Sequence, residues 1–299
     1  MLRALVLFLG WSFFGNFAYA DKLALIIGVN NYDQLPRLQK AVGDSQAVAE
    51  TFQAAGYHTT RHSDLSRERF LEEWAAFRRR IRAGDEVAFV FSGHGLEIDG
   101  FNYLLFSDAP RPGRDESVIR GNAIQVAGLI AELQRGKPRV SLVILDACRN
   151  NPYAARGTRS VGTARGLAPM DAPAGAFVMY SAGAGEEALD RLSDADEEPT
   201  SVYTRRLLPL LKTPNLRIQD VALQVREEVS TLAAEVPHEQ NPAYYDDLRG
   251  KFCFSGCSEG GVSTFTISNS VKKEPAISTD GQAECSTSDP KVSCLWARR

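Results

Sequence analysis

A histidine and a cysteine each follow an apolar run of residues. His94 follows "VAFVFSG" and Cys148 follows "VSLVILDA", and we expect the two strands to end at Phe91 and Leu145. Continuous apolar runs are typical of strands buried on both faces of a parallel sheet. Reactive groups collect beyond the carboxyl ends of such strands. If the two strands are neighbours, the imidazole can activate the thiol as a nucleophile and then protonate a leaving group.

Each of these two residues also has an ordinary structural role. A histidine in a turn is usually structural, and a cysteine at a strand end is often a small buried apolar residue. Cys148 is set apart from the other four cysteines, which lie at positions 253, 257, 285 and 294. In an oxidising compartment those four could form two bridges in three pairings, which would leave Cys148 as the free thiol.

The rest of the chain alternates strand and helix patterns. Buried strands are predicted at 23–29, 87–91, 140–145 and 176–180, a weaker strand at 56–62, a hairpin or short strand at 98–106 and a last strand at 250–254. Helices are predicted at 43–55, 66–82, 122–134, 201–212 and 217–234. This alternation predicts an α/β fold, a three-layer α/β/α sandwich with a mostly parallel central sheet.

The two ends of the chain differ from this pattern. The first 20 residues have Arg3, an apolar stretch at 4–14 and Ala18-Tyr19-Ala20, the order of a secretory signal. We therefore predict a signal peptide at 1–20 and an exported protein, periplasmic or secreted; an uncleaved anchor is the alternative. A domain at 21–254 would follow, and then a Ser/Gly/Thr-rich tail at 255–299, disordered or tied by disulfides. No other stretch has the ~18 apolar residues of a membrane span.

Overall charge points to no polyanionic partner. The formal net charge is −3 in 299 residues, with 24% charged residues. From this composition we expect neither nucleic acid nor an acidic lipid surface as a partner. The sequence does not predict an oligomeric state.

Two blocks of sequence resemble a known family. "FVFSGHG" and "VILDACRNN" are similar to caspase-like cysteine peptidases, most closely the metacaspase or bacterial orthocaspase branch, and "LALIIGVNNY", "GDSQAVAETF" and "GKFCF" extend the resemblance over about 22–254. The resemblance implies a caspase-like fold and a peptide or protein substrate. It also implies Cys148 as nucleophile, His94 as general base and acid, and the N–H groups of Gly95 and Cys148 as the oxyanion hole.

Substrate preference is implied by the residue two positions before the cysteine. Caspases have Gln there, whereas this chain has Asp146, whose side chain should share a direction with that of Cys148. In metacaspases such an Asp joins a second Asp and a Ser, which correspond here to Asp44 and Ser92. Two carboxylates suit one guanidinium, so the resemblance implies cleavage after Arg or Lys. The alternative roles are a helix cap for Asp44 and a turn cap for Asp146.

Two long loops have their own interpretations. The loop at 154–175 contains Arg156, Arg159 and Arg165, where the resemblance implies self-cleavage; a solvated surface loop is the alternative. The acidic loop at 190–201 does not have the spacing of an EF-hand, and most charge runs are solvated. We therefore predict no metal site and no required cofactor, and the sequence leaves open the calcium dependence that is common among metacaspases.

Three other functions are alternatives to an active peptidase that cleaves after Arg or Lys. A catalytically silent caspase-like module that binds peptides or partners would keep the fold without the reaction. A nucleotide-binding domain is disfavoured because "GVNNYDQL" is neither a G-x-G-x-x-G motif nor a P-loop. A legumain-like peptidase with specificity for Asn remains an alternative because the Gly-His-Gly and Ala-Cys blocks are common to that wider group.

Overall fold

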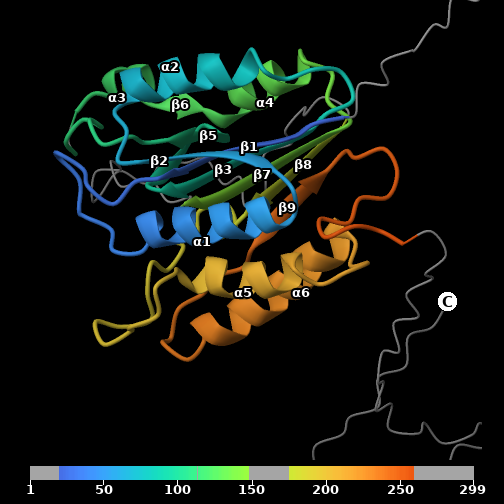
Figure 1. Ribbon diagram of the computed structural model, residues 1–299. Helices are drawn as coiled ribbons and strands as arrows, with labels where there is room; N and C mark the ends of the chain where they lie inside the picture. The colour runs from blue at the N-terminus through green and yellow to red at the C-terminus, as the bar shows by residue number, and fades with distance from the viewer. Residues whose placement is uncertain (1–19, 113, 148–174, 259–299) are drawn as a thin grey trace, which may run out of the picture. The chain divides into compact units, whose positions relative to one another are not determined.

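A six-stranded sheet forms the centre of the structure, a computed structural model that describes residues 20–112, 114–147 and 175–258 (Figure 1). The strand order is β2-β1-β3-β7-β8-β9. All neighbouring pairs are parallel except β8 and β9, which are antiparallel. The strands are β1 (Lys22–Gly28), β2 (His58–Ser63), β3 (Glu86–Gly93), β7 (Val140–Ala147), β8 (Ala176–Tyr180) and β9 (Ala243–Asp246).

Helices cover both faces of this sheet, as the continuous apolar strands require. Successive residues of β3 contribute to different cores: Ala88 and Val90 to one, Val87 and Phe89 to the other. The first core lies under α1 (Ala41–Ala54), α5 (Val202–Leu211) and α6 (Ile218–Ala233). The second lies under α2 (Arg67–Arg78) and α4 (Val126–Gln134). The predicted three-layer sandwich with a mostly parallel sheet is confirmed (Figure 1).

A small second sheet follows the third strand. It contains β4 (Gly95–Ile98), β5 (Phe101–Leu104) and β6 (Ile124–Gln125), and α3 (Glu116–Asn122) precedes β6. The hairpin predicted near 98–106 is therefore present. Its two-residue turn, Asp99-Gly100, has positive φ at both residues, 50° and 80°, a conformation for which Asp-Gly is well suited.

Several predicted elements are wrong or displaced. Residues 250–254, the predicted last strand, form no strand; the last strand is β9. Phe252 and Phe254 instead pack into the core below α1 as irregular chain, so their apolar character reflects burial rather than strand pairing. The strands β3 and β7 each continue two residues beyond the predicted ends, to Gly93 and Ala147. The helix predicted at 66–82 ends at Arg78, and the one predicted at 122–134 begins at Val126.

A disulfide joins Cys253 to Cys257, which is one of the pairs that the sequence left open. Cys285 and Cys294 lie outside the described residues, as do most of the loop at 154–175, most of the tail and the signal segment except its last residue. Within the described ranges, no helix is both long and apolar enough to cross a membrane.

Gly28 allows α1 to approach the end of β1. A Cβ atom at this position would lie 2.3 Å from the carbonyl oxygen of Ala41 and 2.7 Å from the hydroxyl of Ser45. We expect Gly28→Ala to lower the free energy of unfolding by about 1–3 kcal/mol, because backbone of α1 would have to shift. Urea unfolding measures this change.

The control is Gly128→Ala in α4, where an added Cβ meets nothing within 4 Å. This substitution should raise the free energy of unfolding by about 0.5–1 kcal/mol, since alanine is favoured over glycine inside a helix. Equal effects of the two substitutions would show that α1 does not need the close approach at Gly28.

Candidate active site

The strands that lead to His94 and Cys148 are neighbours. In the parallel pairing of β3 with β7, Ser92 lies opposite Asp146 and Gly93 opposite Ala147. Adjacent strands are about 4.8 Å apart, so the two chain segments reach the same edge of the sheet side by side. Cys148 itself lies outside the described residues, and so do Arg156, Arg159 and Arg165.

His94 is held by the loop that follows β1. Its backbone N–H donates to the hydroxyl of Tyr32 at 2.7 Å, and the rings of the two residues lie 4.6 Å apart. Its Nε2 lies 2.8 Å from the carbonyl oxygen of Pro36. Because a carbonyl can only accept, this contact assigns the proton of the neutral ring to Nε2 and leaves the lone pair of Nδ1 for another partner. Neither contact was predicted from the sequence.

Burial keeps the histidine ring neutral. Desolvation lowers the pKa of His94, and the hydrogen bond to Pro36 and the negative charge of Asp190 oppose this effect only in part. A neutral ring with a lone pair on Nδ1 is the form that a general base requires.

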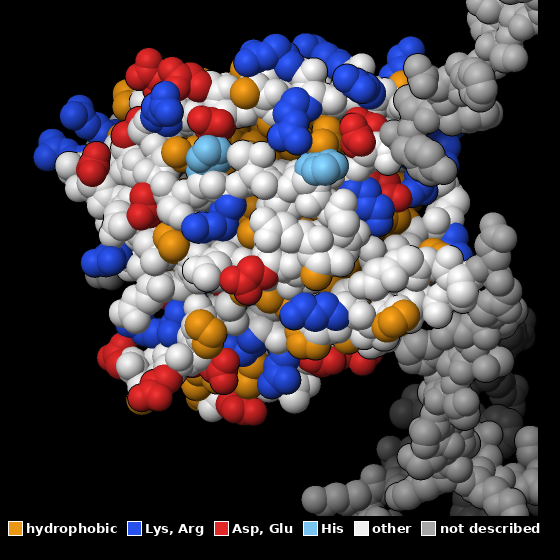
Figure 2. Space-filling model, viewed as in Figure 1, with side chains coloured by type: hydrophobic (Ala, Val, Ile, Leu, Met, Phe, Trp, Pro, Cys, Tyr) orange, Lys and Arg blue, Asp and Glu red, His pale blue; other side chains and the backbone are white. Residues whose placement is uncertain are grey.

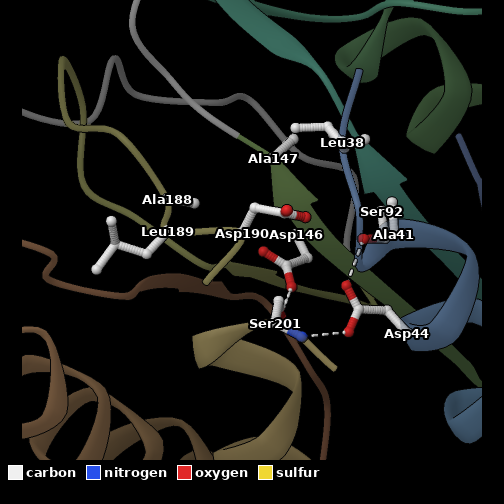
Figure 3. Close-up of a pocket in the computed structure, with 11 residues that line it drawn as sticks. Leu38, Ala41, Asp44, Ser92, Asp146, Ala147, Ala188, Leu189, Asp190 and Ser201 are labelled. Carbon is white, nitrogen blue, oxygen red and sulfur yellow. Dashed lines mark hydrogen bonds between the residues drawn. The ribbon is translucent and has the colours of Figure 1, made fainter. Parts of the chain in front are cut away.

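The three residues that the sequence placed in a substrate pocket do line one pocket, of about 280 Å³ counting its open mouth. Asp44 comes from the first turn of α1, Ser92 from β3 and Asp146 from β7. In Figure 3 the carboxylates of Asp44 and Asp146 both point toward Ser201, the residue that precedes α5. Neither carboxylate has the alternative role: Asp44 caps no helix end, and Asp146 lies within a strand.

Asp44 is held by one hydroxyl and one amide. It is 1% exposed, and it accepts from Ser92 Oγ at 2.8 Å and from the backbone N–H of Ser201 at 2.7 Å. Its pKa is raised well above the usual range, first by burial and then by the neighbouring charge of Asp146. The two hydrogen bonds favour the ionised form and only partly offset burial.

Asp146 is surrounded by hydroxyl groups. Ser201 Oγ donates to it, Thr204 Oγ1 donates at 3.2 Å, and the hydroxyl of Ser181 is a third donor. Burial nevertheless raises the pKa of Asp146. Asp146 has three hydrogen-bond donors and Asp44 has two, so the negative charge of the pair is better stabilised on Asp146.

A third carboxylate, Asp190, lines the same pocket and was missed in the sequence. It accepts from the backbone N–H groups of Gln39 and Lys40, each at 3.0 Å. The acidic loop that contains it looked like a solvated charge run, and nothing in the spacing of its residues indicates a contact some 150 positions away. The pocket therefore has three carboxylates rather than two.

The acidic loop at 190–201 is tied to the start of α1 by a lysine. Lys40 is 9% exposed, and its Nζ donates to the carbonyl oxygens of Asp196 at 2.9 Å and Glu198 at 2.6 Å. The carboxylate of Asp196 pairs with Arg205 at 2.8 Å. An ammonium and a guanidinium therefore engage two carbonyl oxygens and one carboxylate of this loop. Among the described residues, no group of three or more His, Cys, Asp or Glu could hold a metal ion.

Glycines surround the histidine for different reasons. A Cβ at Gly93 would lie 2.7 Å from the hydroxyl of Tyr32, so this position must be glycine for Tyr32 to hold His94. Gly95, the predicted oxyanion donor, begins β4 opposite Leu104 and is buried.

Ser201 connects the pocket to α5. It is the N-cap of α5, since its Oγ accepts from the N–H of Thr204 at 2.9 Å while donating to Asp146. Ser201→Ala would remove both the cap and one donor to a buried carboxyl group. We expect it to lower the free energy of unfolding by about 2–4 kcal/mol, measured by urea unfolding.

Ser66→Ala is the matched control, because Ser66 caps α2 through the N–H of Arg69 without contacting a carboxylate. It should cost only about 1 kcal/mol. If the two substitutions cost the same, the bond from Ser201 to Asp146 contributes nothing to stability.

Comparison with known proteins agrees with the fold. A sequence model of the caspase domain matches residues 21–253. The human mucosa-associated lymphoid tissue lymphoma translocation protein 1 is 26% identical over 134 residues, which are 44% of this chain and 16% of the human protein. Its mouse homolog is 25% identical over 134 residues, with the same shares, so the chain matches only 16% of the length of each relative. The match to the caspase domain covers most of the chain, and the protein belongs to the caspase domain family.

Proposed function

We propose that this protein is a cysteine endopeptidase that cleaves peptides after Arg or Lys. The observation that carries the proposal is the neutral ring of His94 beside the end of β7, next to a pocket lined by three carboxylates. We further propose that the protein acts after export, with the signal at 1–20 removed.

In the proposed mechanism, Nδ1 of His94 takes the proton of the Cys148 thiol. The thiolate then attacks the scissile carbonyl carbon, and the N–H groups of Gly95 and Cys148 stabilise the resulting oxyanion. The imidazolium is stabilised by its bond to the carbonyl oxygen of Pro36. It returns a proton to the leaving amine, and water, activated by the neutral ring, hydrolyses the thioester.

The pocket supports a preference for a basic side chain next to the scissile bond. A guanidinium or ammonium that enters it would face Asp44, Asp146 and Asp190. An acidic side chain would bring a further negative charge into a site where burial already opposes ionisation. The same preference supports self-processing, because Arg156, Arg159 and Arg165 follow the proposed nucleophile in sequence.

Fluorogenic peptides with Arg, Lys, Asn or Asp before the scissile bond test the proposal. We expect hydrolysis of the Arg and Lys peptides, and none of any peptide by Cys148→Ala. Asp146→Asn should lower kcat/KM for the Arg peptide on the order of 100-fold, the typical effect of removing one partner of a buried charge pair.

Asp194→Asn is the matched control, because Asp194 lies in the acidic loop at 190–201 but its side chain is 96% exposed and does not line the pocket. It should leave kcat/KM unchanged. Preference for the Asp or Asn peptide would contradict the assigned specificity, and inertness toward all four peptides would favour a binding module. Identical band patterns of the active protein and Cys148→Ala after incubation would rule out self-cleavage.

Because the pKa values of the pocket carboxyl groups are raised, we expect their ionisation to lower the stability of the protein and to raise its activity toward the Arg peptide. An acid whose pKa is raised by folding holds its proton more tightly in the folded state, so stability falls as pH rises from the unfolded value of about 3.9 through the folded one. Asp44→Asn should therefore raise the melting temperature at pH 7–8 and abolish one step in the rise of kcat/KM with pH for the Arg peptide. Thermal melts and pH profiles measure the two effects.

Asp115 provides a control of opposite sign. Asp115 is the exposed N-cap of α3, and hydrogen bonds from Ser117 lower its pKa. The ionised Asp115 therefore stabilises the folded protein above the pKa of the unfolded state, and this stabilisation is lost as the pH falls through the pKa of the folded state. Asp115→Asn should lower the melting temperature at pH 7–8 and leave the pH profile of kcat/KM unchanged. A melting temperature lowered equally by both variants would contradict the assignment of a burial cost to Asp44.

A further inference from the structure

Exposed basic side chains gather at the end of the sheet opposite the candidate active site. They come from two connections, between α2 and β3 and between α4 and β7. We call five of these residues the basic edge: Arg79, Arg80, Arg82, Arg135 and Lys137, all of them exposed. Figure 2 shows Lys and Arg side chains clustered along the upper rim of the view, where α2 ends.

The two connections lie side by side. The N–H of Gly84 donates to the carbonyl oxygen of Lys137 at 3.0 Å. The N–H of Arg139 donates to the carbonyl oxygen of Asp85 at 2.8 Å. This contact follows from the sheet, because β3 and β7 begin opposite each other at Glu86 and Val140. Two stretches of basic sequence some fifty residues apart therefore form one surface.

Nearby carboxylates are already engaged by other groups. Asp85 is buried and accepts from the backbone N–H groups of Asp21 and Arg82. Glu86 pairs with Lys22 and Arg139.

A third carboxylate near the basic edge, that of Glu132, pairs with Arg78. Within the part of the chain that the structure describes, no ion pair involves a residue of the basic edge. Further along this end of the sheet, two acidic residues, Asp246 and Asp247, are followed in sequence by two basic ones, Arg249 and Lys251. No carboxylate of the described residues therefore pairs with the five cations of the basic edge.

The chain enters the domain at this same end. β1 begins at Lys22, opposite Glu86 of β3, and Asp21 is bonded to Asp85 beside the basic edge. The basic edge and the entry of the chain into the domain thus lie at one end of the sheet, while His94 and the carboxylate pocket lie at the other.

We propose that the basic edge is a docking surface for a membrane rich in anionic phospholipid. Several exposed cations without a pocket suit an extended array of phosphate groups, and each Lys or Arg close to such a surface adds to the attraction. Docking by this end leaves the candidate active site facing away from the membrane. The net charge of the chain does not reveal this surface, because acidic residues elsewhere lower the total.

Sedimentation of the full chain with vesicles tests the proposal. Vesicles of phosphatidylcholine are compared with vesicles that also contain phosphatidylglycerol, for the unaltered chain and for Arg79→Gln/Arg82→Gln/Lys137→Gln. We expect the unaltered chain to favour the anionic vesicles, and the triple variant to lose on the order of 100-fold of this preference. High salt should have a similar effect. The ratio of binding to the two vesicle types measures the contribution of the basic edge. Apolar insertion into the bilayer does not need anionic lipid and would raise binding to both types.

Arg69→Gln/Arg111→Gln/Arg114→Gln is the matched control, with the same change in charge at exposed positions away from the basic edge. It should retain the preference for anionic vesicles. An equal loss in both triple variants, or no preference in the unaltered chain, would overturn the proposal. Tighter binding to duplex DNA than to anionic vesicles at equal phosphate concentration would also overturn the assignment to lipid. None of these outcomes depends on peptidase activity.

Discussion

Two carboxyl groups buried at one end of the sheet set the main constraint on this structure. Asp44 and Asp146 are 1% and 7% exposed, and burial of either as an anion is unfavourable unless hydrogen bonds compensate. The compensation comes from Ser92, Ser181, Ser201 and Thr204, which belong to different elements of the fold. These elements can meet only when the sheet and α5 are packed together, so the pocket depends on the complete tertiary structure.

The acidic loop at 190–201 is therefore part of the pocket and not a solvated surface segment. Its first residue, Asp190, is fixed by two amides at the start of α1, and its last, Ser201, contacts both buried carboxylates. Between them, Lys40 supplies a positive charge to two carbonyl oxygens. A buried ammonium thus helps to hold in place a loop that is rich in carboxylates.

Local sequence patterns predicted the parts of the site that depend on strand direction. The apolar runs before His94 and Cys148 indicated two buried parallel strands, and their pairing in the sheet follows from that. The spacing of residues in the sequence could not predict the contact of His94 with Pro36, because a backbone carbonyl has no sequence signature. Nor could it predict the place of Asp190 in the pocket, because the contacts of Asp190 span about 150 residues. The segment at 250–254 misled for a related reason: its apolar residues fill the core under α1 without joining the sheet.

One loop connects the geometry of the base with that of the pocket. Between β1 and α1, Tyr32 and Pro36 fix the backbone and tautomer of His94, while the amides of Gln39 and Lys40 fix Asp190. A displacement of this loop would change the direction of Nδ1 and the arrangement of the carboxylates together. In the proposed mechanism Nδ1 acts as the base and the carboxylates select the substrate, so both proposed roles depend on this one loop.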